Sequence, residues 1–131
     1  MFYKVIEKSV PQQDGTRVKK WYAQQITMGR STLEMICESV AEATTITEAD
    51  ARAVIFQLVK EIRNRLIAGQ IVELGELGNF QLTILSNGGA PTKADYTVDL
   101  IKKAKVTYRP GVRVKAIAQD ANFTRWSGDK D

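Results

Sequence analysis

The chain has 131 residues, 44% hydrophobic and 26% charged, values typical of one globular domain with at most a short addition. Its formal charge is +4, which suits an anionic partner, and it contains no histidine and one cysteine, Cys37. These counts exclude Ser-His-Asp and Cys-His catalytic groups, His-bearing metal sites, cysteine zinc clusters and internal disulfides, so a binding protein is expected rather than an enzyme.

Positive charge is concentrated in residues 1–30, which carry a net +4, whereas residues 31–68 carry a net −2. An anion-binding surface is therefore expected on the N-terminal segment and the later strands. No apolar run approaches the roughly 18 residues that would span a bilayer, and the first residues lack the pattern of a secretory signal. These features predict a cytoplasmic protein with no membrane partner, cofactor or small-molecule substrate.

Residues 2–8 and 18–24 are rich in aromatic and β-branched side chains, and they predict a β-hairpin with turn-forming residues between the strands. Its register stays open because the connection is long for a tight hairpin. Trp21 and Tyr22 beside basic residues could form an aromatic nucleic-acid platform. The two rings alternate across a strand, so packing is the simpler interpretation.

Two amphipathic helices are predicted next. The segment Ser31-Thr32-Leu33-Glu34 has the form of a capping box with Ser31 as the N-cap. A second capping signal at Thr47 precedes a longer apolar stripe that ends at Gly69. This helix has apolar residues on more than one side, which a unit this small cannot cover alone, so a symmetric dimer is expected.

The pattern then changes to the alternation of strands. Residues 71–74 and 80–84 predict two strands joined by a glycine-containing turn, and residues 87–91 form a strong turn signal. A third strand is predicted from Tyr96 to Arg109, with an interruption near Ala104 left open. A short helix over residues 112–120 and a polar tail that docks or frays complete the chain.

Three stretches resemble the HU/IHF family of histone-like bacterial DNA-binding proteins. They are the capped helix pair of residues 31–69, the turn of residues 72–80 and the segment of residues 106–111. The turn is similar to the family's V-x-L-x-G-F-G-T-F pattern, and Val-Thr-Tyr-Arg-Pro-Gly is similar to its F-K-P-G stretch. The added N-terminal strands look like those of the extended HU-like proteins of Bacteroidetes.

The resemblance implies an α+β, HU/IHF-like fold, in which a helical hairpin lies on a three-stranded antiparallel sheet with a β-arm. It implies an intertwined homodimer that binds double-stranded DNA in the nucleoid with little sequence preference. The expected organisation is an N-terminal β-extension over residues 1–29, an HU-like DNA-binding domain over residues 30–120 and a C-terminal tail over residues 121–131.

The resemblance also implies a set of DNA contacts. In the family, an arm-tip proline wedges between base steps and bends the duplex, and Pro91 lies near that position. The other expected contacts are polar or basic residues that meet phosphates. The full set is Arg30, Asn79, Pro91, Lys102, Lys103, Lys105, Arg109, Arg113 and Lys115. The three lysines are included for their charge beside the arm, and an ordinary solvated strand edge is the alternative for them.

The arm differs from the family pattern in its charge. The family's arm carries several arginines, whereas residues 81–101 contain one base, Lys93, against Asp95 and Asp99. Because phosphate contacts supply most of the non-specific affinity for DNA, such an arm should bind DNA weakly. The alternative is an HU-like dimeric protein-interaction or structural module that has lost DNA wrapping.

Overall fold

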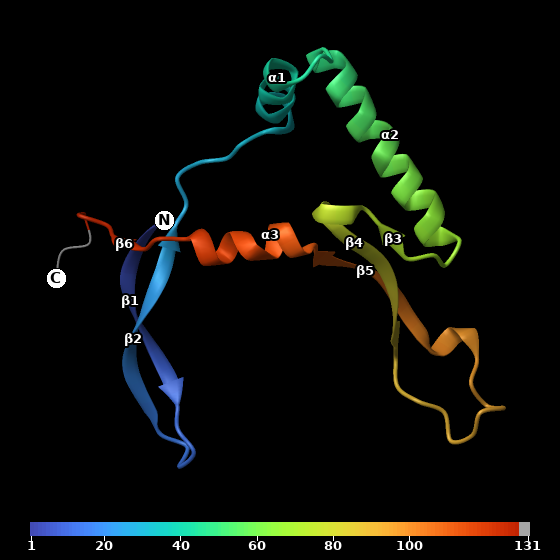
Figure 1. The fold of residues 1–131 in the computed structure, drawn as a ribbon. Coiled ribbons are helices and arrows are strands. Elements are labelled where there is room, and N and C mark those ends of the chain that lie inside the picture. The colour runs from blue at the N-terminus through green and yellow to red at the C-terminus, as the bar shows by residue number, and fades with distance from the viewer. Residues whose placement is uncertain (129–131) are drawn as a thin grey trace. The chain divides into compact units, whose positions relative to one another are not determined.

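The computed structural model describes residues 1–128, which divide into two compact units (Figure 1). One unit contains residues 1–31 and the described chain from Ala118 onward, and the other contains residues 32–117. No helix in the described residues has both the length and the apolar character needed to cross a membrane.

The first unit is built on the predicted hairpin, which is confirmed. Strand β1 (Phe2–Pro11) pairs antiparallel with β2 (Arg17–Ile26), and Phe2 lies opposite Ile26. Both strands run further than predicted, so the turn contains only residues 12–16. A hydrogen bond of 2.7 Å from the Gln12 N–H to the Thr16 carbonyl oxygen closes it.

The C-terminal segment adds a third strand to this sheet. Strand β6 (Thr124–Arg125) pairs parallel with the start of β1, which gives the order β2-β1-β6. Trp126 meets Phe2 edge to face, with ring centroids 5.3 Å apart. Of the two outcomes predicted for the tail, the structure shows docking.

The second unit begins with helices α1 (Leu33–Ala43) and α2 (Glu48–Ile67). Thr32, and not the predicted Ser31, is the N-cap of α1, because the Thr32 hydroxyl accepts the Met35 N–H at 3.3 Å. The capping signal of α2 is confirmed as a reciprocal box between Thr47 and Asp50. Gly69 follows the α2 C-cap with a φ of +80°, a conformation that favours glycine.

A three-stranded antiparallel sheet follows, in the order β3 (Val72–Glu73), β4 (Gly78–Ser86) and β5 (Ile101–Pro110). A 3-10 turn over Gly75–Leu77 joins β3 to β4.

The prediction of a strand from Tyr96 is wrong. Residues Val98–Leu100 form a 3-10 helix instead, and the Asn87 N–H closes the loop by donating to the Leu100 carbonyl oxygen at 2.7 Å. Strand β5 is continuous through Ala104, which lies opposite Ile84. The final helix is shorter than predicted, with α3 over Val112–Ala116 and a 3-10 turn over Ile117–Asp120.

The second unit covers little of its apolar surface. Among the described residues, the buried hydrophobic side chains are Cys37, Ala51, Leu66 and Val72. An open groove of about 400 Å³ runs between α2 and the sheet. Its apolar lining is Val59, Ile62, Leu66, Ile67, Phe80, Leu82 and Val106.

Candidate nucleic-acid interface

The register of β4 and β5 gathers four of the predicted contact residues on one face of the sheet. Asn79 lies directly opposite Arg109, and Lys103 and Lys105 face Leu85 and Thr83. Residues directly opposite one another, or two apart along a strand, share a face. The sheet therefore presents Asn79, Lys103, Lys105 and Arg109 together.

The other face of the same strands is apolar. Phe80 and Tyr108 lie opposite one another with ring centroids 5.1 Å apart. Phe80 also lines the groove along α2, with Leu82 and Val106. The cations therefore lie on the sheet face that points away from α2.

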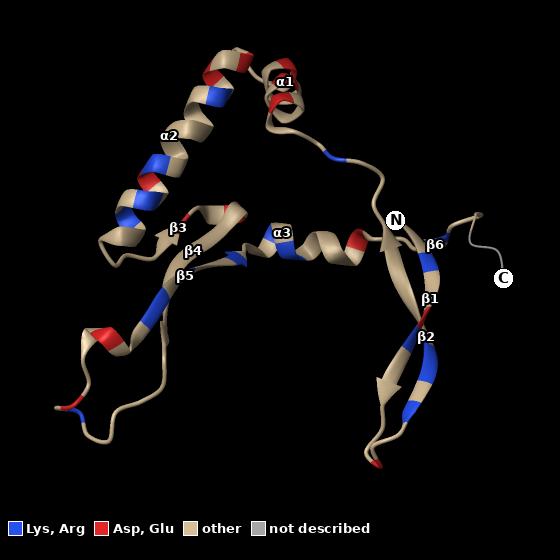
Figure 2. Cartoon of the chain, turned by 180° about the vertical axis from the view of Figure 1, so that it is seen from behind, with Lys and Arg blue, Asp and Glu red and all other residues tan. Residues whose placement is uncertain are grey.

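Lys103, Lys105 and Arg109 are exposed, and none of them forms an ion pair within residues 1–128. Figure 2 shows basic residues on β5, whereas the loop between β4 and β5 carries both signs, with Asp95 and Asp99 against Lys93. Uncompensated ammonium and guanidinium groups on one strand can neutralise successive phosphates, because these groups are free to displace the counterions of a polyanion.

Lys102 stands apart from this set. The ladder shifts between Leu85 and Ser86, which pair with Lys103 and Ile101, so Lys102 has no partner opposite it. The extra residue is typical of a β-bulge, which re-aims side chains. The run of three lysines therefore does not form a regular row, a feature that sequence alone could not reveal.

The turn before β4 packs against the end of β5 and sets the position of Arg109. A Cβ added to Gly78 would lie 2.2 Å from the Arg109 carbonyl oxygen, and one added to Gly111 would lie 2.3 Å from the Glu76 carbonyl oxygen. The Gly78 N–H donates to the Gly75 carbonyl oxygen, so this amide is engaged within the turn. The glycines permit a backbone approach that no other residue allows.

On α3, the two predicted basic contacts differ. Arg113 Nη1 lies 2.9 Å from Glu76 Oε2 in an exposed ion pair, so this guanidinium already has a carboxylate partner. Lys115 forms no ion pair among the described residues. The Arg113–Glu76 pair joins positions 37 residues apart, and the sequence carried no signal for it.

Two predicted contacts belong to neither the sheet nor α3. Arg30 belongs to the unit that contains the hairpin. Pro91 lies in the loop between β4 and β5, where the Thr92 hydroxyl donates to Asp95 Oδ2 at 2.6 Å. A bond of 2.8 Å between the Ser86 and Tyr96 hydroxyls also ties the loop to the end of β4.

The two-helix layer and the three-stranded antiparallel sheet, with cations on the outer sheet face, define a mixed α+β protein of the HU/IHF type. Residues 1–125 match the family model described as "HU domain fused to wHTH, Ig, or Glycine-rich motif". The chain therefore belongs to this HU-HIG family.

Relatives agree with this assignment, and a solved structure has a similar fold. Integration host factor subunit alpha of Colwellia psychrerythraea is 30% identical over 88 residues, which is 66% of this chain and 91% of that protein. Its counterpart from a Marinomonas species is 27% identical over 94 residues, 71% of this chain and 96% of that protein. A candidate DNA-binding protein from Bacteroides vulgatus superposes with a TM-score of 0.60 at 10% identity. That match covers 95% of this chain but 47% of the other, and it shows the fold alone.

Proposed function

We propose that this protein is an architectural DNA-binding protein of the nucleoid that acts as a homodimer and binds duplex DNA with little sequence preference. The observation that carries the proposal is the row of uncompensated cations on the outer face of the sheet, Lys103, Lys105 and Arg109. Phosphate contacts of this kind give affinity without sequence information. Asn79 adds a polar group beside Arg109.

The proposed homodimer rests on the apolar groove between α2 and the sheet. Val59 is 59% exposed and Val106 is 56% exposed, although both line a groove whose lining is apolar apart from Arg63. A second copy that covered this groove would bury surface that one chain leaves in water, and such burial stabilises association by about 25 cal/mol per Å² before its entropic costs.

The loop between β4 and β5 would lie in the minor groove, with Pro91 against a base step. A wedge of this kind offsets the cost of unstacking by bringing more basic surface to the bent duplex. Beyond the strands, this loop has Lys93 against Asp95 and Asp99, so most of the affinity would come from the sheet face.

The test is binding to a fluorescent duplex of about 30 base pairs, followed by anisotropy at several salt concentrations, with a second duplex of unrelated sequence. The full chain should bind both with a steep negative log–log salt slope. The double variant K103Q/K105Q should have a slope shallower by up to about 1.8, since each lost phosphate contact removes about 0.9. The control K60Q removes one charge from α2 and should keep the slope.

The competing function is a protein-interaction module on the same frame, which the acidic character of the loop favours. Failure of the full chain to bind either duplex at low salt would contradict DNA binding and favour this second function. A slope that K103Q/K105Q leaves unchanged would remove the two lysines from the interface.

A further inference from the structure

The N-terminal hairpin has two faces that differ in the balance of their charges. The register places Lys4, Lys8 and Lys20 on one face, which we call the lysine face, together with Tyr22. This face contains no acidic residue from either strand. The opposite face carries Arg17 and Lys19, together with Glu7, the acidic residue of the two strands.

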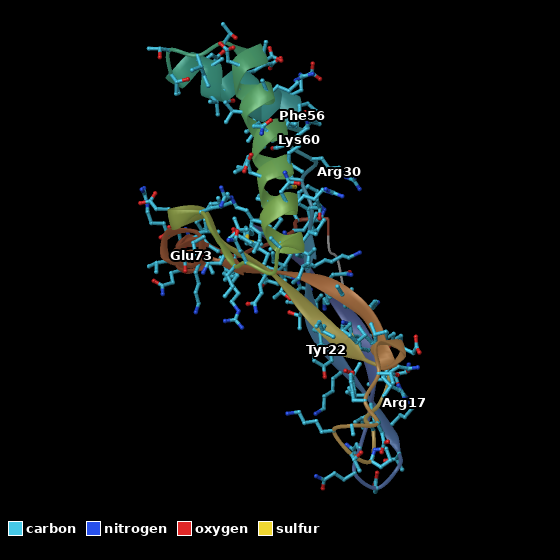
Figure 3. All side chains as sticks on the ribbon, turned by 90° about the vertical axis from the view of Figure 1, so that its right-hand side faces the viewer. Arg17, Tyr22, Arg30, Phe56, Lys60 and Glu73 are labelled. Atoms are coloured by element: carbon cyan, nitrogen blue, oxygen red, sulfur yellow. The ribbon has the colours of Figure 1, made fainter. Side chains whose placement is uncertain are left out.

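The opposite face compensates its own charges. Lys19 Nζ lies 3.4 Å from Glu7 Oε2, and the Arg17 guanidinium donates two hydrogen bonds of 2.9 Å to Ser9. Figure 3 shows Arg17 near the tip of the hairpin and Tyr22 nearer its middle. Basic side chains on that face therefore already have partners within the hairpin.

The lysine face contains a like-charge pair. Lys8 and Lys20 lie directly opposite one another in the ladder, and such positions hold their Cβ atoms about 5 Å apart. Like charges opposite one another destabilise a sheet. Neither lysine, nor Lys4, lies within ion-pair distance of a carboxylate in residues 1–128.

An aromatic ring accompanies these lysines. Lys8 Nζ lies 5.8 Å from the centroid of the Tyr22 ring, which is 39% exposed. Lys4 precedes Lys8 by four residues, a separation of about 13 Å along an extended strand. The face thus has two ammonium groups side by side and a third further along β1, with an amphipathic ring beside them.

We propose that the lysine face of the N-terminal hairpin is a second DNA-binding surface that contacts the phosphate backbone of duplex DNA. This inference rests on the proposed DNA binding of the chain. An extended polyanion satisfies all three ammonium groups at once, and it relieves the repulsion between Lys8 and Lys20. A phenol ring of this exposure can pack against a sugar or a base edge while its neighbours neutralise phosphates.

Two double variants of the full chain test the proposal, because each removes two positive charges from the same hairpin. K8Q/K20Q alters the lysine face, whereas R17Q/K19Q alters the opposite face and is the matched control. Anisotropy against a fluorescent 30-base-pair duplex should give K8Q/K20Q a salt slope shallower by up to about 1.8. R17Q/K19Q should keep the wild-type slope.

Thermal unfolding separates binding from folding. K8Q/K20Q should unfold close to the wild-type temperature, since it removes a like-charge pair and also the contact between Lys8 and the Tyr22 ring. An equal loss of slope in both variants would show an effect of net charge alone and would overturn the proposal. So would an unchanged slope in K8Q/K20Q, the result expected if this face meets a protein partner.

The same measurements distinguish this inference from the proposed function. If K103Q/K105Q loses slope and K8Q/K20Q does not, the hairpin surface is rejected and the sheet interface stands. If only K8Q/K20Q loses slope, the hairpin surface stands and the sheet interface is rejected. If the full chain binds no duplex, both are rejected.

Discussion

The Tyr108 hydroxyl donates a hydrogen bond of 2.6 Å to the Leu77 carbonyl oxygen, and this bond ties the end of β5 to the turn that precedes β4. The same oxygen accepts a longer bond, 3.5 Å, from the Gly111 N–H. The Leu77 carbonyl group therefore binds the residues on either side of Arg109 and Pro110. Because Arg109 lies between these two donors, its position depends on this contact.

Tyr108→Phe should lower the free energy of unfolding by about 1 kcal/mol, the usual net value of one intramolecular hydrogen bond. Urea denaturation measures the change, and hydrogen exchange at Gly111 should become faster. Unchanged unfolding together with unchanged exchange would show that the hydroxyl bond does not hold the turn.

Gly78→Ala should destabilise the protein by more than about 1 kcal/mol, because the new Cβ meets the Arg109 carbonyl and the φ of +119° disfavours any other residue. Gly89→Ala is the matched control. A Cβ there meets nothing within 4 Å and φ lies outside the positive range, so the substitution should be neutral or slightly stabilising. Equal unfolding midpoints for the two variants would contradict the close approach.

Pro91→Ala should leave the affinity for a 30-base-pair duplex within a few-fold of wild type but reduce its bending, since a wedge acts on deformation more than on phosphate contact. Energy transfer between dyes at the duplex ends measures the bend. Pro11→Ala, at the end of β1, makes the same substitution in the hairpin and should not affect bending. Wild-type bending in the Pro91 variant would exclude the wedge.

Val59→Lys should convert the proposed homodimer to a monomer, because it places a charge in the apolar groove along α2. Light scattering should then give the 14.6 kDa of one chain instead of twice that mass. Val98 is 76% exposed and lies outside the groove, so Val98→Lys should keep the dimer. A wild-type chain of monomer mass would reject the homodimer at once.

Hydrogen bonds from Thr16 lower the pKa of Asp14 below its ordinary value of 3.8, the hydroxyl bond contributing more than the backbone bond. The hydroxyl donates at 2.6 Å and the backbone N–H at 3.0 Å. A lowered pKa means that the carboxylate stabilises the turn above pH 3.8 and that this contribution is lost as the pH falls through the lowered pKa.

Thr16→Val removes the hydroxyl and keeps the backbone bond, so the Asp14 pKa should rise toward 3.8 without reaching it. A carbon-detected NMR titration measures this pKa in both proteins. A value that stays as low as in the wild type would assign the shift to a different group.

Local signals in the sequence predicted much of the fold. The capping box at Thr47 and Asp50 and the helix end at Gly69 depend on neighbouring residues, so they could be recognised directly. The sequence could not decide between Ser31 and Thr32 as the N-cap of α1, because both hydroxyl groups precede the helix. The structure shows that the Thr32 hydroxyl accepts the backbone hydrogen bond. The apolar pattern near Val98 is typical of a strand, but residues Val98–Leu100 form a 3-10 helix. The Leu100 carbonyl oxygen there accepts the Asn87 N–H, a contact between distant residues that the local pattern does not indicate.

The candidate site was predictable as a set of residues but not as an arrangement. Arg109, Lys103 and Lys105 follow from charge and from the family resemblance, whereas their common face depends on the register with β4. The bulge at Lys102 and the ion pair of Arg113 depend on contacts between distant segments. Strand β6 is two residues long, and no local pattern indicates so short a strand.

The pairing of β6 with β1 makes the second unit an insertion within the first. Residues 32–117 are contiguous, whereas the hairpin sheet takes its third strand from beyond them. The Met1 ammonium donates to the Asn122 carbonyl oxygen at 2.6 Å, which joins the two flanking segments. During synthesis from the N-terminus, β1 and β2 emerge first. Their sheet gains its third strand only after the whole inserted unit has been made.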